Sequence, residues 1–281
     1  NDSAGNRNDT ASIVFSVDNT QVNSCKTLNQ ANTTYTLTQN INNIVGSCFT
    51  ITADNITLNG AGYIIDGDAS DAEDFGITAT NRINITIKNF RNISEFGNIG
   101  AVGPDQGAGI FFSNVDNSLI INVTANANYR GIELTSGSNN NNITDIIVNS
   151  NVDSEGITIS SSNNNVIRNI TARANINNIY ISSSTGNNFT SGNISNSVQH
   201  AIVLIGATSS DNALENITIL GTNGNSRDIS FSTAALNGTY LIDMPHIGNY
   251  TFTGTGSIVY VKDSRFGEIR FLQAVNGSGN N

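Results

Sequence analysis

Six charged residues in the middle of the chain have the types and spacing that acid–base chemistry could use. A carboxyl group beside a second carboxyl group or an arginine can move a proton at a sugar oxygen, provided that both groups reach the same substrate atom. Isolated charges on a solvated face are the alternative interpretation, since Glu, Asp and Arg are mostly exposed. The six residues are Arg130, Glu133, Asp153, Glu155, Arg168 and Arg173.

An acidic stretch, DGDASDAEDFG at 66–76, is a candidate cation site. Several carboxylates within one short loop suit a hard cation such as Ca²⁺. Ca²⁺ is the only cofactor that the sequence suggests. Their spacing differs from that of an EF-hand loop, and an acidic corner without a metal is the alternative. The candidate ligands are Asp66, Asp68, Asp71, Glu73 and Asp74.

The two histidines, His200 and His246, do not indicate a metal centre. Neither has a cysteine or a second histidine at the spacing of a zinc site. Copper delivery would need a chain rich in methionine or histidine, and this chain has one methionine. We therefore expect both histidines to be ordinary surface or cap residues.

Asn-x-Ser/Thr motifs are the strongest modification signal in the chain. Where the middle residue is Ile, Val or Phe, a strand would point it inward and turn the Asn and the hydroxyl residue outward. In a chain rich in Asn and Thr, strand alternation also produces such motifs without any glycosylation, and this is the alternative to N-glycosylation. The acceptors with an apolar middle residue are Asn55, Asn84, Asn92, Asn122, Asn142, Asn169, Asn188, Asn193 and Asn216, and the others are Asn1, Asn8, Asn32, Asn237, Asn249 and Asn276.

Composition argues against two classes of partner. The 281 residues carry 12 Lys and Arg against 22 Asp and Glu, a formal net charge of −10. Without a basic cluster, nucleic acid is not an expected partner. No apolar run approaches the ~20 residues of a membrane-spanning helix, so membrane insertion is not expected either.

Short apolar alternations recur along the chain and indicate the fold. They begin with CFTITA at 48–53, and each is followed by a polar patch and a second alternation, such as NITLNG at 55–60. Two or three short strands in every ~22–25 residues, without a helical stripe, predict a parallel β-helix of about eight coils between 48 and 235. The later members are GITATN (76–81), GIFFSN (109–114), GIELTS (131–136), GITISS (156–161), NIYISS (178–183), AIVLIG (201–206) and DISFST (228–233).

The asparagine clusters between these alternations are expected at the corners of the coils. Asn tolerates left-handed backbone conformations, and asparagines stacked on successive coils can form hydrogen-bonded ladders. In SSNNNVIRNITA at 161–172, strict alternation would place Arg168 inward or Ile167 outward. We therefore expect a bulge or bend near Arg168–Asn169 that leaves Asn169 outward and Ile170 inward.

The ends of the chain differ from its middle. Residues 1–20 are expected to form an extended arm that includes a strand at 10–17, and residues 21–236 are expected to form the β-helix. Residues 237–281 are richer in Tyr, Phe and charge, and we expect a C-terminal β cap or small sheet followed by a linker.

The two cysteines, Cys25 and Cys48, are 23 residues apart, close to the repeat period. Placed one coil apart, their Cα atoms would lie within the ~4.4–6.8 Å that a disulfide spans. A disulfide would staple the first coil to its neighbour and would indicate an oxidising compartment. Two free thiols are the alternative.

The block SCKTLNQANTTYTLTQNI…SCFTITADNITLNGAGYIIDG, followed by coils of the GI…/NNITI kind, resembles right-handed parallel β-helix repeat proteins of the NosD-like type. In particular, it is similar to large secreted surface proteins of archaea. The resemblance implies an extracellular all-β protein, but sugar-active enzymes, copper-delivery proteins and structural proteins share such folds. The Asn-Thr-Asp, Asp-Asp, Gly-His-Gly and Arg-Ile-Lys segments of pectin hydrolases are absent from the chain.

These observations favour a non-catalytic extracellular structural protein that carries N-glycans at the cell surface. A bare first coil and a separate strand at 10–17 could pair with another copy of the chain and build a head-to-tail filament. The alternative is a polysaccharide-binding or polysaccharide-cleaving β-helix protein. That alternative predicts a groove along one strand face, with carboxylates, arginine and aromatic platforms on neighbouring coils.

Overall fold

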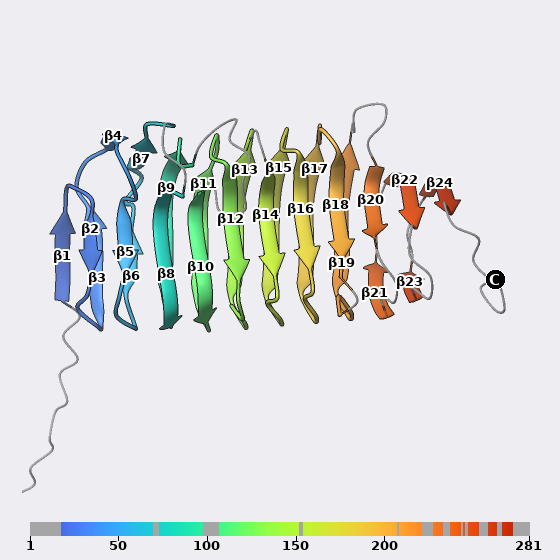
Figure 1. Cartoon of the computed structure of the whole chain (residues 1–281), viewed down its shortest axis with the longest axis horizontal. Helices are drawn as coiled ribbons and strands as arrows, with labels where there is room; N and C mark the ends of the chain where they lie inside the picture. Colours follow the sequence, from blue (N-terminus) through green and yellow to red (C-terminus); the bar gives the residue numbers. More distant parts are fainter. Residues whose placement is uncertain are drawn as a thin grey trace, which may run out of the picture.

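The computed structural model of the chain is a stack of short β-strands (Figure 1). The described part contains no helix, and hence no helix that could cross a membrane. The predicted strand at 10–17 lies outside the described residues. These residues are 18–69, 73–97, 107–151, 154–206, 208–220, 227–232, 237–242, 244, 247–252, 258–262 and 266–271.

Two parallel sheets run along the whole stack, and the chain alternates between them. Sheet A contains β1 (Asp18–Val22), β3 (Thr33–Leu37), β4 (Ile41–Ile44), β6 (Thr57–Asn59), β7 (Ile64–Gly67), β9 (Thr86–Ser94), β11 (Leu119–Ala125), β13 (Asn142–Asn149), β15 (Val166–Arg173), β17 (Asn188–Ser195), β19 (Ala213–Leu220), β21 (Asn237–Ile242) and β23 (Ile258–Lys262). Sheet B contains β2 (Lys26–Leu28), β5 (Phe49–Ile51), β8 (Phe75–Ile83), β10 (Ala108–Asp116), β12 (Arg130–Thr135), β14 (Glu155–Ser160), β16 (Asn177–Ser182), β18 (His200–Ile205), β20 (Arg227–Ser232), β22 (Ile247–Phe252) and β24 (Phe266–Phe271).

The predicted all-β parallel β-helix is confirmed: the chain is a parallel β-solenoid of the right-handed type, with about eight turns from β5 to β20. Every pairing between described strands is parallel and joins one turn to the next, as in β12 with β14. The space between the sheets is filled by Ile, Leu, Val and Phe side chains, such as Phe112, Ile132 and Ile157, all fully buried. Stacking the turns therefore buries one continuous apolar core.

The strands of sheet A bend at one residue that adopts a left-handed conformation. In β15 this residue is Asn169, with φ of 51°. Arg168 and Asn169 are exposed, whereas Ile167 and Ile170 on either side are buried, so the predicted bend is confirmed. A left-handed bend suits Asn and Asp, which tolerate this region better than most side chains. The residues at the same register position in neighbouring strands are Asn89, Asn122, Asp145, Ser191 and Asn216.

Buried asparagines close the corners that lead into sheet A. Asn165 Oδ1 accepts a hydrogen bond from the backbone N–H of Asn141 at 2.9 Å. Its Nδ2 donates to the carbonyl of Ser138 and to Oδ1 of Asn187, both at 3.0 Å. The same arrangement repeats one turn on between Asn187 and Asn212. Each buried corner amide thus finds its partner in the side chain of the next turn, as buried backbone groups require.

Both ends of the described chain belong to the same stack. The disulfide between Cys25 and Cys48 is present, with a Cα–Cα distance of 4.5 Å, and it ties the first turn to the second. At the other end, β21 and β23 extend sheet A, and β22 and β24 extend sheet B, all in parallel pairing. Strand pairing therefore continues across the boundary that we expected at residues 236 and 237.

We predict that Asn165→Ala lowers the free energy of unfolding by about 2–4 kcal/mol, because it leaves buried backbone groups of Asn141 and Ser138 without partners. Asn164→Gly is the matched control: Asn164 is exposed and has φ of 56°, which glycine adopts without strain. Urea unfolding followed by circular dichroism measures both. An Asn165→Ala protein as stable as the control would contradict the role of the ladder.

Reduction of the disulfide, or Cys48→Ser together with Cys25→Ser, is expected to remove about 3 kcal/mol, since the bond closes a loop of this length in the unfolded chain. Thermal unfolding with and without a reducing agent measures the change. The double serine variant must lose its response to the reducing agent. An unchanged melting temperature on reduction would show that the first turn is held by its packing alone.

Candidate functional site

The outward side chains of sheet B form two columns along the stack. The first column contains Arg130, Glu155, Asn177 and His200 on successive turns. The second column contains Phe111, Glu133, Thr158, Tyr180 and Val203. We call these two columns together the sheet B face. Turns lie ~4.8 Å apart, so the sheet B face offers a straight row of regularly spaced groups.

Arg130 joins two carboxylates on this face. Its Nη1 donates to Oε2 of Glu133 at 3.3 Å, and its Nε donates to Oε2 of Glu155 at 3.4 Å. The three side chains are 14–17% exposed, so they are largely shielded from bulk water while still at the surface. One guanidinium therefore holds two carboxylates from adjacent turns within a short distance of each other.

A local irregularity in the strand puts Arg130 and Glu133 on the same side. In strict alternation, residues three apart point to opposite faces, but here Gly131 and Ile132 between them are both buried. A Cβ on Gly131 would approach Nδ2 of Asn151 to 2.9 Å. The Gly of the recurring GI segments thus makes room for the buried asparagine at the corner, and the following residues turn outward again.

Glu155 has two further polar neighbours. Ser154 Oγ donates to its Oε2, and Asn177 Nδ2 donates to its Oε1 at 3.3 Å. On the same face, Asn177 Oδ1 and Thr158 Oγ1 are buried without a hydrogen-bond partner among the described residues. Asn177 is 7% exposed and Thr158 is 5% exposed. Buried polar atoms without a hydrogen-bond partner are rare and costly.

Tyr180 lies on the turn after Thr158 in the second column. Burial raises the pKa of its hydroxyl above the usual 10.0, and the negative charge of Glu155 raises the pKa further. A hydrogen bond with Ser182 and the charge of Arg130 act in the opposite direction. The phenol therefore keeps its proton at neutral pH and is available as a hydrogen-bond donor.

Aromatic rings lie next to the charged groups. Phe75 and Phe111 form a tilted pair with ring centroids 4.6 Å apart, and both rings are partly exposed. Phe111 is the direct neighbour of Glu133 in the register of β10 and β12. On the next turn, the guanidinium of Arg130 lies 5.1 Å from the ring centroid of Tyr129. Aromatic rings, which the polysaccharide alternative predicts, therefore lie beside the carboxylates.

The structure brings together three of the six charged candidates. Arg130, Glu133 and Glu155 converge, whereas Arg168 and Arg173 are exposed on β15 of sheet A. Asp153 lies outside the described residues. Asn177, Tyr180 and the Phe75–Phe111 pair were not predicted, although the repeat period of 22–25 residues places Asn177 and Tyr180 one turn from Glu155 and Thr158.

The structure does not group the candidate calcium ligands as it groups Arg130 and the two glutamates. Asp66 accepts a hydrogen bond from Ser94 Oγ at 2.5 Å, and Glu73 is exposed. Asp68 and Asp74 each interact with other groups of the protein, and Asp71 lies outside the described residues. Within the described part, no three His, Cys, Asp or Glu side chains are grouped to hold a metal ion. The calcium site stays a prediction.

The candidate glycosylation acceptors mostly face the solvent. In all nine motifs with an apolar middle residue, that residue is buried, as predicted. Asn92 and Asn188 are partly buried, and the Oδ1 of each is shielded without a partner in the described part. Asn1, Asn8 and Asn276, and the side chains of Asn237 and Asn249, lie outside the description. The exposed acceptors are Asn32, Asn55, Asn84, Asn122, Asn142, Asn169, Asn193 and Asn216.

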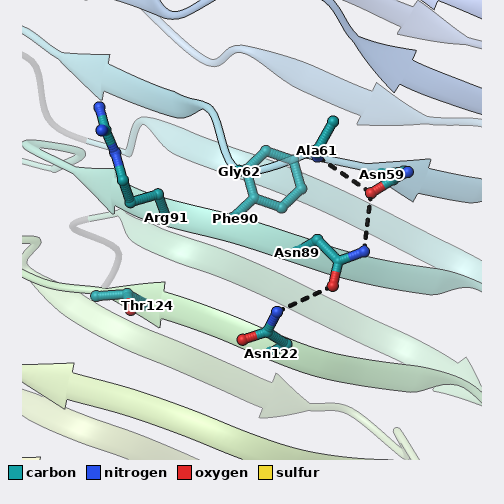
Figure 2. A pocket seen from close by; sticks show the side chains of 8 residues that line it. All are labelled: Asn59, Ala61, Gly62, Asn89, Phe90, Arg91, Asn122 and Thr124. Carbon is teal, nitrogen blue, oxygen red and sulfur yellow. Dashed lines mark hydrogen bonds between the residues drawn. The ribbon is translucent and has the colours of Figure 1, made fainter.

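An open hollow lies at the bend of sheet A, away from the sheet B face (Figure 2). Asn89 Nδ2 donates to Asn59 Oδ1 at 3.1 Å, and Asn122 Nδ2 donates to Asn89 Oδ1 at 3.0 Å. Arg91 extends away from this ladder. None of the lining residues has a carboxyl group, so the hollow has no acid–base pair. It is lined by Asn59, Ala61, Gly62, Asn89, Phe90, Arg91, Asn122 and Thr124.

No family model and no curated protein matches the chain. Several solved structures are similar to it. An alginate lyase from Paenibacillus sp. str. FPU-7 is 13% identical with a TM-score of 0.53, over 89% of this chain and 99% of that chain. A DFA-IIIase from Arthrobacter chlorophenolicus A6, in complex with DFA-III, is 12% identical with a TM-score of 0.58, over 88% and 73% of the two chains. The catalytic domain of a GH87 alpha-1,3-glucanase, in complex with nigerose, is 12% identical with a TM-score of 0.55, over 91% and 60%.

These comparisons correct our expectation of function. A non-catalytic structural protein that assembles into filaments was our main prediction, and it is wrong: the structures similar to this chain are a lyase, a DFA-IIIase and a glucanase. They favour the alternative of a β-helix protein that acts on polysaccharide. At these identities the likeness itself shows the fold, and the NosD-like and archaeal resemblance stays a prediction beyond that fold.

We predict that Glu155→Gln lowers the pKa of Tyr180 toward 10.0, because it removes a negative charge while the burial stays. Tyrosine labelled with ¹³C at Cζ and followed by NMR titration gives the pKa, and Tyr180→Phe assigns the signal. Glu215→Gln on sheet A is the control and leaves the titration unchanged. A Tyr180 pKa at or below 10.0 in the unsubstituted protein would contradict the shielded environment that we describe.

Proposed function

We propose that the chain binds a polysaccharide along the sheet B face and hydrolyses its glycosidic bonds with Glu133 and Glu155. The observation that carries this proposal is the contact of both carboxylates with one guanidinium, that of Arg130. Glycoside hydrolysis needs a pair of carboxyl groups on either side of one glycosidic bond. Two glutamates on adjacent turns, linked by an arginine, supply such a pair.

The reaction divides between the two carboxyl groups. One of them, in its acid form, donates a proton to the glycosidic oxygen as the bond from that oxygen to the anomeric carbon breaks. The other, as a carboxylate, takes a proton from the attacking water, or first bonds to the anomeric carbon itself. In both routes one water is consumed, the leaving sugar receives one hydrogen, and the new hemiacetal carries the hydroxyl group.

The neighbouring residues would hold the pair in place. Arg130 fixes the separation of the two glutamates, and Ser154 and Asn177 fix the orientation of Glu155. All but Ser154 stand on β-strands of a continuous sheet, and sites built on such elements keep their geometry better than sites on loops. Phe111, one turn before Glu133, offers an apolar ring against which the C–H face of a sugar can pack.

The location and the modification of the chain follow as further parts of this proposal. The Cys25–Cys48 disulfide favours an oxidising compartment, and thus an extracellular site of action. There, the exposed acceptors would carry N-glycans. Asn84 Nδ2 donates one hydrogen bond to Asn55 Oδ1 at 2.8 Å. An amide nitrogen has two hydrogens, so the second is free for a sugar.

We predict that Glu133→Gln and Glu155→Gln each lower the rate of polysaccharide cleavage by about 10²–10⁴-fold, the contribution of a general acid or base. Release of reducing ends from a panel of soluble polysaccharides measures the rate. Affinity electrophoresis in gels that contain the same polymers measures binding, which we expect to change by less than about threefold.

The matched control is Glu215→Gln, which removes one carboxylate from sheet A and is expected to keep full activity. Two results would contradict the proposal. One is undiminished cleavage in both variants of the sheet B face. The other is the absence of cleavage and binding by the unsubstituted chain across the panel.

A further inference from the structure

The polymer that this site takes can be narrowed by charge, on the premise that the proposed function is right. We infer that the sheet B face takes a polymer of neutral sugars and not a polyuronate. A preference for neutral sugars would distinguish this chain from the alginate lyase to which its fold is similar.

Arg130 is already neutralised from two sides. Its Nη1 and Nε donate to Glu133 and Glu155, so its positive charge is already balanced by carboxyl groups of the protein. The cluster has a net charge of −1 when both carboxyl groups are ionised and of 0 when one is in its acid form. In neither state does it carry the net positive charge that would attract a further carboxylate into a shielded surface.

Other arginines on sheet B are engaged or distant. Arg82, on β8, lies two turns before Arg130 and its Nη1 lies 3.6 Å from Oδ1 of Asp54. Arg227, on β20, pairs in register with His200, which places its backbone four turns beyond Arg130. Four turns correspond to ~19 Å. Among the described side chains, a polyuronate, with a carboxylate on every sugar, would therefore meet only the arginine that already contacts both glutamates.

The uncharged groups suit sugar hydroxyls. The phenol of Tyr180 keeps its proton and can donate a hydrogen bond to a sugar hydroxyl group. Such a contact needs no charge on the sugar. The partly exposed Phe75–Phe111 pair lies on the turns just before the carboxylates and matches the apolar face of a neutral ring.

Affinity electrophoresis at pH 8, where an ordinary histidine is neutral, tests the inference. The probes are a soluble α-glucan, a soluble β-glucan and inulin on one side, and alginate and polygalacturonate on the other, each with and without Ca²⁺. We expect at least one neutral polymer to retard the chain, and Phe111→Ala to weaken that retardation at least tenfold. We expect neither polyuronate to retard it.

The outcomes separate this inference from the proposed function. Retardation by a polyuronate, with or without Ca²⁺, together with loss of cleavage in Glu155→Gln, would overturn the neutral-sugar inference and leave hydrolysis standing. No retardation by any of the five polymers and no cleavage would overturn both. Retardation by neutral polymers and by neither polyuronate, together with loss of cleavage in Glu155→Gln, supports both.

A variant with altered charge gives a second, independent test. Glu133→Gln combined with Glu155→Gln removes both carboxylates but keeps amide oxygens that can accept from Arg130. The cluster then carries a net charge of +1, and we expect this variant to gain salt-sensitive retardation by alginate or polygalacturonate of at least tenfold. If a variant that folds with native circular dichroism gains none, charge is not what excludes polyuronates, and the inference fails.

Discussion

The structure depends on satisfying the backbone hydrogen bonds of its buried corners. A parallel solenoid pairs its strands with the turns on either side, but a corner has no ladder of its own. Here the side chain of one turn completes the backbone of its neighbour, as Asn165 does for Asn141 and Asn187 does for Asn165. Asn offers an acceptor and two donors in a short side chain, which explains why the chain is so rich in it.

This constraint also determines where functional side chains can stand. The ladder of Asn128, Asn151 and Asn175 lies beneath the start of sheet B strands and leaves no room for a Cβ at Gly109, Gly131 or Gly156. Gly and Ile in succession are both buried there, so the alternation shifts and the residues on either side of the Gly-Ile pair both point outward. The same corner that completes the backbone therefore brings Arg130 and Glu133 to one face.

Much of the fold could be predicted from the sequence, but little of the site. The recurring GI segments and the conflict at Arg168 were enough to predict the coils and a bend, because period and alternation are local properties. The convergence of Arg130 with Glu155 depends on register between turns, which the variable spacing of the repeats obscures. Arg168 belongs to the opposite sheet because it lies in the second of the two apolar alternations of its coil. The shielding of Tyr180 has no sequence signal, since it arises from packing across turns.

The energetic character of the cluster argues that it was not placed there for stability. Shielding two carboxylates and one guanidinium costs desolvation that their mutual attraction does not fully recover, and apolar residues at such positions are often as stable or more so. The same columns do carry Phe111 and Val203 on other turns, so the sheet tolerates apolar groups there. The lining of the hollow at Asn59 and Asn89, by contrast, includes asparagines of the ladder and one arginine but no carboxyl group. The three charged side chains, which are costly to shield, lie together at one point of a rigid row of strands. Tyr180, whose pKa is raised, lies beside them. Such concentration is what a reactive site requires and what a scaffold avoids.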